Sequence, residues 1–232
     1  MIRIKGLSKS FGKLKVLRSL NATIQDKKIT AIVGHNGSGK TTLIKCILGL
    51  DKLDSGKILI DGFNLNGDWS YRKHIGYMPQ MAQFPENLTG EELLDMIIDI
   101  REQPEHTKEV LVEHFKLKTE LKKPLKHLSG GTRQKINVIL ALMFDPQLLL
   151  LDEPSSGLDP VSSSLLKDMI MMEKARGKTI IITSHIMSEI QELADTILYL
   201  VDGQIIFDGP VLELIRQSGE KNLERAVAKM MS

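Results

Sequence analysis

The sequence of 232 residues predicts an α/β fold built around a mostly parallel sheet. Several short apolar runs are apolar at every position, as expected of strands that are buried on both faces of a parallel sheet. Helix-forming stretches separate these runs, and such alternation is typical of α/β proteins. The predicted strands are "ITAIV" (29–33), "KILI" (57–60), "LLLLD" (148–152), "TIIIT" (179–183) and "TILYL" (196–200).

Antiparallel elements are expected beside this sheet, including in the N-terminal part of the chain. Asp202-Gly203 in "VDGQIIFDG" lies between two apolar runs and predicts a tight hairpin. Asp61-Gly62 in "ILIDGFNL" predicts a second hairpin in the same way.

The middle of the chain predicts an inserted α-helical subdomain over residues 81–144, where no run has the character of a strand. Thr89 and Glu92 have the spacing of a capping box at a helix start. We therefore expect one domain over 1–232, in which 1–80 and 145–232 form the α/β core. The expected apolar face of the first inserted helix consists of Leu93, Leu94, Ile97 and Ile98.

Composition indicates a globular chain without a broad electrostatic preference for nucleic acid. Hydrophobic residues make up 42%, charged residues 26%, and the formal net charge is +2. No run approaches the roughly 20 apolar residues that span a bilayer, and the N-terminus has no apolar signal region. The single cysteine, Cys46, excludes an internal disulfide and is expected to be a small buried side chain. A cytoplasmic location is expected, with membrane association possible through a partner.

The segment "GHNGSGKTT" (34–42) matches the Walker A pattern of a P-loop NTPase, and it lies between a predicted strand and a predicted helix. Its glycines let successive backbone N–H groups point at phosphate oxygens, and the helix N-terminus favours the same anion. Lys40 is expected to reach the β- and γ-phosphates, and the Thr41 hydroxyl to bind Mg²⁺. An Asn-Lys-x-Asp element for guanine is absent from the sequence, so ATP is the predicted nucleotide. The other expected nucleotide-binding residues are Gly34, Asn36, Gly37, Ser38, Gly39 and Thr42.

Two acidic residues follow the four leucines of the strand at 148–152. Asp152 at its end has the position of a Walker B acid, which holds Mg²⁺, and Glu153 could polarise the attacking water as a general base. Further along, Asp159 precedes Pro160 and is expected to cap a helix that stops at Gly177.

A second glycine-rich helix start occurs in "HLSGGTRQKINVILALMF". Ser129, Gly130 and Gly131 could cap this helix or could form another anion site of backbone N–H groups. The chain therefore has two candidate anion sites of backbone N–H groups, the phosphate loop and this second helix start.

The segment "LSGGTRQ" (128–134) resembles the signature motif of the ABC ATPases, and the resemblance covers nearly the whole chain with its motifs in the family order. It implies that Phe11 in "KSFG" stacks on adenine and that Gln80 in "YMPQ" contacts Mg²⁺ and the attacking water. It also implies that His185 in "TSHIMSEI" contacts the γ-phosphate. By themselves these three residues could be a core aromatic, a surface polar residue and a strand-end histidine. "SSGLDP" matches the D-loop of this family. The resemblance therefore implies that Asp159 has a functional role in addition to capping a helix.

Departures from the family pattern are small: His35 stands where many relatives have Pro, and Lys135 where many have Arg. In this family two ATPase domains pack head to tail, and the signature of one closes over the nucleotide that the other holds. The resemblance thus implies a second ATPase subunit, expected as a homodimer, and an integral membrane subunit that docks near 80–90. Phe84 and Pro85 in this stretch are expected to be exposed and to suit a docking surface. The enzyme is then peripheral on the cytoplasmic face of the membrane and does not act on nucleic acid.

Two other functions compete with the transporter ATPase. A soluble ABC ATPase of DNA repair, chromosome maintenance or translation would usually carry long coiled-coil insertions or two tandem ATPase domains, and this chain has neither. A small-molecule kinase would leave "LSGGTRQ" and His185 unexplained.

The segments "GHNGSGKTTLIKCILGL" and "MPQMAQFPENLT" resemble those of ATPases whose transporters serve copper-site assembly of nitrous oxide reductase. No physical argument favours that cargo over drugs, lipids or polysaccharides, and the six histidines form no metal-ligand cluster in the sequence.

Overall fold

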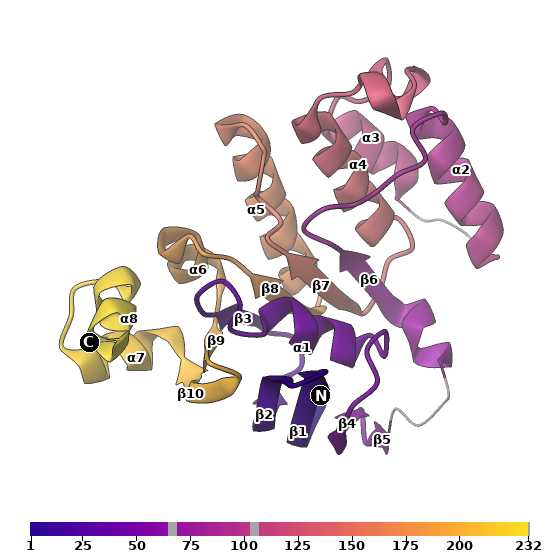
Figure 1. The fold of residues 1–232 in the computed structure, drawn as a ribbon. Coiled ribbons are helices and arrows are strands. Elements are labelled where there is room, and N and C mark those ends of the chain that lie inside the picture. Colours follow the sequence, from indigo (N-terminus) through magenta and orange to yellow (C-terminus); the bar gives the residue numbers. More distant parts are fainter. Residues whose placement is uncertain (65–68, 103–106, 232) are drawn as a thin grey trace. The chain divides into compact units, whose positions relative to one another are not determined.

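A computed structural model of the protein describes residues 1–64, 69–102 and 107–231 (Figure 1). The chain divides into two compact units. The first unit combines Met1–Arg72 with Glu173–Ser232, and the second is Lys73–Met172. Two elements cross a boundary between units, namely η1 (Ser70–His74) and α5 (Pro160–Ala175).

An antiparallel sheet forms the N-terminal part of the first unit, as the sequence predicts. Its strand order is β2-β1-β4-β5. The run "KILI" belongs to this sheet, in which Ile58 is buried and Lys57 is exposed, so this predicted strand is covered on one face only. Asp61 and Gly62 both have positive φ, 50° and 87°, and form the predicted tight turn between β4 and β5. The strands are β1 (Ile2–Phe11), β2 (Leu14–Ile24), β4 (Ser55–Ile60) and β5 (Phe63–Asn64).

A second sheet of the first unit has the strand order β10-β9-β3-β8. Strand β3 (Ile29–Val33) is parallel to both β8 (Thr179–Thr183) and β9 (Thr196–Val201). Every residue of β3 and β8 is buried, as their unbroken apolar sequence predicts. Strand β10 (Gln204–Pro210) pairs with β9 in the antiparallel direction, which confirms the predicted hairpin at Asp202-Gly203.

Among the described residues, four helices lie entirely within the first unit. Helix α8 packs against α6 and α7, and it buries Leu223, Ala226 and Val227. The helices are α1 (Lys40–Ile47), α6 (Met187–Leu193), α7 (Val211–Ser218) and α8 (Leu223–Met231).

The second unit contains a parallel strand pair, β6 (Ile75–Met78) with β7 (Leu148–Asp152). Helix α4 (Gly130–Leu142) packs along β6 so closely that a Cβ atom on Gly76 would lie 2.0 Å from the carbonyl oxygen of Ala141. Only glycine therefore fits at this position of the strand. Between the two strands the described residues form helices, turns and one isolated bridge; besides α4 the helices are α2 (Gly90–Arg101), α3 (Lys108–His114), η2 (Glu120–Lys122) and η3 (Leu125–His127).

Helix α2 begins with the capping box that the sequence predicts. The Thr89 hydroxyl accepts the Glu92 N–H at 3.1 Å, and the Glu92 carboxylate accepts the Thr89 N–H at 2.8 Å. These hydrogen bonds lower the pKa of Glu92. Leu93 and Leu94 are buried as expected. Within the described ranges, no helix has the length and apolar character that crossing a membrane requires.

Candidate functional site

The phosphate loop connects β3 to α1 in the first unit, and its glycines are needed for two different reasons. A Cβ atom on Gly34 would lie 2.1 Å from the carbonyl oxygen of Leu200, so this position requires the absence of a side chain. Gly37 and Gly39 have φ of 84° and 109°, a region that L side chains rarely adopt. The Ser38 N–H donates to the carbonyl of His35 at 3.1 Å, which tightens the loop before α1 begins at Lys40.

Lys40 and Ser38 place polar atoms inside this loop. The Nζ atom of Lys40 donates to the carbonyl oxygens of Gly34 at 2.9 Å and of His35 at 3.2 Å. The Oγ atom of Ser38 is buried and has no hydrogen-bond partner among the described residues. A buried hydroxyl without a partner is unfavourable unless a ligand completes its hydrogen bonding. The loop therefore has the features of an anion cradle.

Phe11 and His185 lie in the same unit. Phe11, at the end of β1, is 49% exposed, and the Lys9 Nζ atom lies 4.8 Å from the centre of its ring. His185 is exposed on the turn that follows β8. The buried Ser184 hydroxyl shapes this turn because it accepts the Ile186 N–H at 3.1 Å and donates to Glu189 at 2.8 Å.

The acidic strand end belongs to the second unit. Asp152 and Glu153 are both buried at the end of β7. Glu153 has φ of 51°, a left-handed conformation that costs a non-glycine residue about 1–2 kcal/mol. Burial, and secondarily the charge of Asp152, raises the pKa of the neighbouring Tyr77 to about 12. The strained backbone and the buried carboxylates are typical of a functional site.

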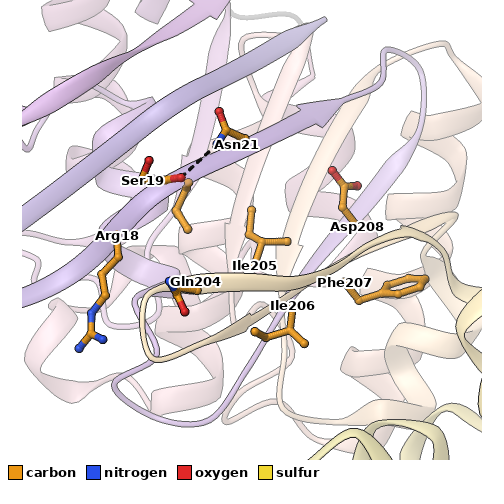
Figure 2. Close-up of a pocket in the computed structure, with 9 residues that line it drawn as sticks. Arg18, Ser19, Asn21, Gln204, Ile205, Ile206, Phe207 and Asp208 are labelled. Atoms are coloured by element: carbon orange, nitrogen blue, oxygen red, sulfur yellow. Dashed lines mark hydrogen bonds between the residues drawn. The ribbon is translucent and has the colours of Figure 1, made fainter.

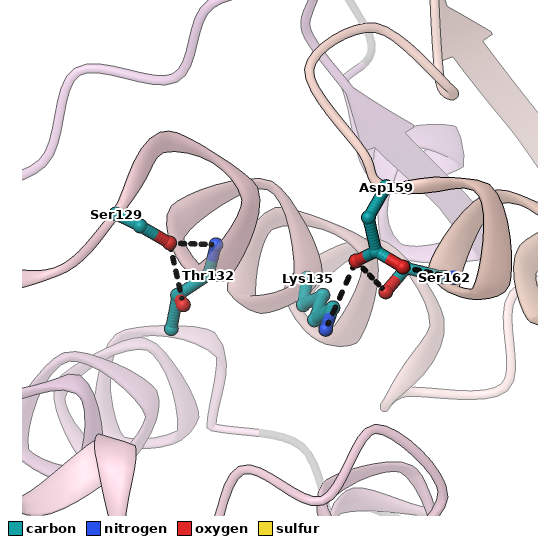
Figure 3. A network of polar contacts seen from close by, with 5 residues as sticks. All are labelled: Ser129, Thr132, Lys135, Asp159 and Ser162. Carbon is teal, nitrogen blue, oxygen red and sulfur yellow. Dashed lines mark hydrogen bonds and ion pairs between the residues drawn. The ribbon is translucent and has the colours of Figure 1, made fainter.

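Two helix starts of the second unit are capped by their predicted residues (Figure 3). The Asp159 carboxylate accepts the Ser162 N–H at 3.0 Å and the Ser162 hydroxyl, and these hydrogen bonds lower its pKa. The Ser129 hydroxyl accepts the Thr132 N–H at 3.1 Å, so Ser129 is the N-cap of α4. An ion pair of 3.8 Å between Lys135 and Asp159 links helix α4 to the start of α5.

The segment 80–90 follows β6 in the second unit. Gln80 and Pro85 are exposed, but Phe84 is half-buried, which corrects the expectation that Phe84 is exposed. Met81 is 82% exposed, and it is the large hydrophobic side chain that this segment exposes.

A groove of about 460 Å³ lies between β2 and β10, and none of the predicted site residues lines it (Figure 2). Arg18 and Gln204 contribute polar atoms, and Ile206 is exposed. Burial raises the pKa of Asp208 in this groove. Sequence reasoning missed the groove because β2 and β10 are far apart along the chain and belong to different sheets.

Comparison with known proteins agrees with the phosphate loop, the signature helix and the mixed α/β fold. The sequence pattern of the ABC transporter family matches residues 17–156. The lantibiotic transport ATP-binding protein SrtF of Streptococcus pyogenes is 34% identical over 97% of this chain and 94% of its own length. A solved ATP-binding subunit of an ABC transporter superposes with a TM-score of 0.92 and 29% identity, with full coverage of both chains. A dimeric ATP-binding cassette bound to ADP and Pi shares the fold, with a TM-score of 0.80, 24% identity, and coverage of 90% of this chain and 98% of the other.

The protein is thus an ATP-binding cassette with the P-loop NTPase fold. It belongs to the ABC transporter family, whose members hydrolyse ATP to drive transport. The comparisons confirm the prediction of a transporter ATPase and support it over the soluble ABC ATPase and the small-molecule kinase.

Proposed function

We propose that the residues singled out above divide the hydrolysis of ATP among them. Lys40 and the backbone N–H groups of the phosphate loop hold the β- and γ-phosphates, while Phe11 stacks on adenine. Glu153 acts as general base toward the attacking water, and His185 contacts the γ-phosphate. The observation that supports this assignment most directly is the loop in which the Lys40 ammonium group and the Ser38 hydroxyl are buried together.

Mg²⁺ is proposed as the metal that accompanies ATP. Thr41 follows the phosphate-loop lysine, Asp152 offers a buried carboxylate, and Gln80 offers an amide oxygen. Oxygen donors of these types suit Mg²⁺, which neutralises charge that develops on the phosphates.

A second copy of the chain completes each site in this proposal. Ser129, Gly130 and Gly131 form the start of helix α4, where the first backbone N–H groups have no carbonyl partner within the helix. Asp159 is tied to the same helix through Lys135. These residues of one subunit contact the nucleotide that the other subunit holds, in a head-to-tail homodimer. The cassette that shares this fold is dimeric, which supports an assembly of two ATPase subunits.

The domain boundaries follow from the same proposal. Residues 1–232 form one ATPase domain, in which 1–80 and 145–232 are the α/β core and 81–144 are the helical subdomain. The membrane subunit docks on 80–90, where Met81 offers an exposed apolar side chain, and it holds the ATPase on the cytoplasmic face.

Cargo is chosen by the membrane subunit. The sequence resemblance points to a transporter that serves copper-site assembly, and the relative SrtF points to the transport of a lantibiotic. The genes next to this one would identify the membrane subunit and decide between the two.

Mixing two inactive subunits tests the shared site. Lys40→Ala disables the phosphate loop, and Ser129→Arg blocks the cradle on α4, so each homodimer carries two damaged sites. A mixed dimer combines both lesions in one site and leaves the other intact, so ATPase activity should return on mixing. If labelled subunits form mixed dimers and activity stays absent, the shared site is wrong.

A further inference from the structure

Helix α4 presents one face to strand β6 and to the residue that follows it. Ala141 approaches the backbone of Gly76, and one turn earlier the Asn137 side chain donates from Nδ2 to the Pro79 carbonyl oxygen at 2.8 Å. Residues 137 and 141 lie four apart, so they share a helix face. Helix α4 therefore packs closely against β6 at Gly76, and it holds Pro79, just beyond the strand, through a hydrogen bond.

Asn137 is an unusual residue for this place in the sequence. It is 2% exposed, and its neighbours Ile136, Val138 and Ile139 are buried apolar side chains. Asparagine has a poor helix propensity, and a buried amide is unfavourable unless it is hydrogen-bonded. An apolar side chain would satisfy the packing alone, so the donor to Pro79 is the property that distinguishes this residue.

The hydrogen bond to Pro79 restricts the backbone direction of Gln80, the residue that follows it. The proline ring fixes φ, and the planar peptide links the direction of the Pro79 carbonyl to the position of the Gln80 nitrogen and Cα. Anchoring the carbonyl oxygen therefore fixes the peptide plane from which the exposed Gln80 side chain projects.

The same helix makes a similar contact near Glu153. Gln134, which is buried and three residues before Asn137, donates from Nε2 to the Pro154 carbonyl at 3.3 Å. Both side chains thus donate to the carbonyl of a proline that adjoins a proposed catalytic residue.

We propose that Asn137 is a positioning residue that orients Gln80 toward the nucleotide-bound Mg²⁺ by anchoring the Pro79 carbonyl. This inference rests on the proposed role of Gln80. It predicts that the effect of losing the Asn137 donor disappears when Gln80 is absent. Mutation of a residue that hydrogen-bonds to a metal ligand and orients it typically lowers metal affinity or activity 10–100-fold.

Hydrogen exchange on the nucleotide-free protein tests the anchor without relying on turnover. Asn137→Leu removes the donor at similar volume, and Asn137→Ala serves if the leucine variant does not fold. Amides of residues 80–84 should exchange about tenfold faster in the variant, consistent with the loss of one anchoring hydrogen bond. Val138→Ala, on the same helix and equally buried, should leave these amides unchanged. Equal exchange in Asn137→Leu and the unmodified protein overturns the proposal.

A double-mutant cycle on ATPase turnover tests the connection to Gln80. The Mg²⁺ concentration for half-maximal turnover should rise about tenfold in Asn137→Leu, and by less than twofold when the same change is made in Gln80→Ala. Equal factors in the two backgrounds overturn the positioning role. If Gln80→Ala changes the Mg²⁺ dependence and Asn137→Leu does not, only this inference fails. If Gln80→Ala itself has no effect, the proposed role of Gln80 fails with it.

Discussion

The Nζ atom of Lys40 lies 2.9 Å from the carbonyl oxygen of Gly34, the first residue of its own phosphate loop. A hydrogen bond from a charged donor is stronger than one between neutral groups, so this contact closes the loop around the ammonium group. Its second acceptor, the carbonyl of His35, belongs to the same loop. The carbonyl groups of the loop thus hold a positive charge in place inside it.

Lys40→Ala should weaken Mg-ATP binding by roughly 10–100-fold, because it removes a charged hydrogen-bond donor worth about 1.5–3 kcal/mol. Titration calorimetry would measure the affinity. Lys45→Ala is the matched control, since Lys45 is on the same helix and exposed. Unchanged affinity in Lys40→Ala would show that the lysine serves the loop and not the nucleotide.

Glu153→Gln should retain Mg-ATP binding and reduce turnover by about 10²–10⁴-fold, because the amide cannot accept a proton from water. The side chain keeps its size, so the strained backbone at this position is unaffected. Calorimetry and a phosphate-release assay would separate the two effects. Loss of ATP binding in this variant would mean that Glu153 is structural.

Met81→Asp should release the ATPase from its membrane subunit, because the change places a charge in an apolar contact. The two proteins would be co-expressed, and the ATPase measured in the membrane fraction. Met81 is a better probe than Phe84, whose half-burial would mix docking with folding. Leu212→Asp, at a 72% exposed position on α7, is the control and should stay bound. Equal release by both variants would contradict docking at 80–90.

Cys46 should be unreactive in the native protein, because burial raises the pKa of its thiol from 9.0 to about 12. At pH 8 the folded chain then holds about a thousandfold less thiolate than the unfolded chain, and thiolate is the reactive form. The stability that this raised pKa contributes is present below pH 9 and is lost as the pH rises toward 12. A thiol reagent added with and without denaturant would measure the difference; rapid native labelling would contradict it.

Local signals predicted much of the fold. The five named strands and both hairpins depend on nearby residues, such as the two-residue turn at Asp202, and the sequence alone shows these. Strand β6 was not among the predicted strands because it has four residues and contains Gly76, which weakens a strand pattern. The reason for that glycine is Ala141 on α4, a contact that only tertiary structure provides.

Motif residues of the candidate site could be named from the sequence, but the contacts that hold them could not. Asn137 has no motif, and its partner is a backbone carbonyl distant in sequence. The half-burial of Phe84 likewise depends on how the segment after β6 packs. Long-range packing, not local chemistry, decides these features.

Gly34 and Gly37 of the phosphate loop differ in what they exclude. At Gly34 the Leu200 carbonyl leaves no volume for a methyl group, whereas at Gly37 no described atom lies within 4 Å of an added Cβ and only the positive φ opposes one. A D-alanine introduced at position 37 by chemical ligation has the mirror-image backbone preference, so it would fit where L-alanine is strained by about 1–2 kcal/mol. Position 34 thus selects by volume and position 37 by chirality, so the loop could be stiffened at position 37 by a residue that no codon specifies.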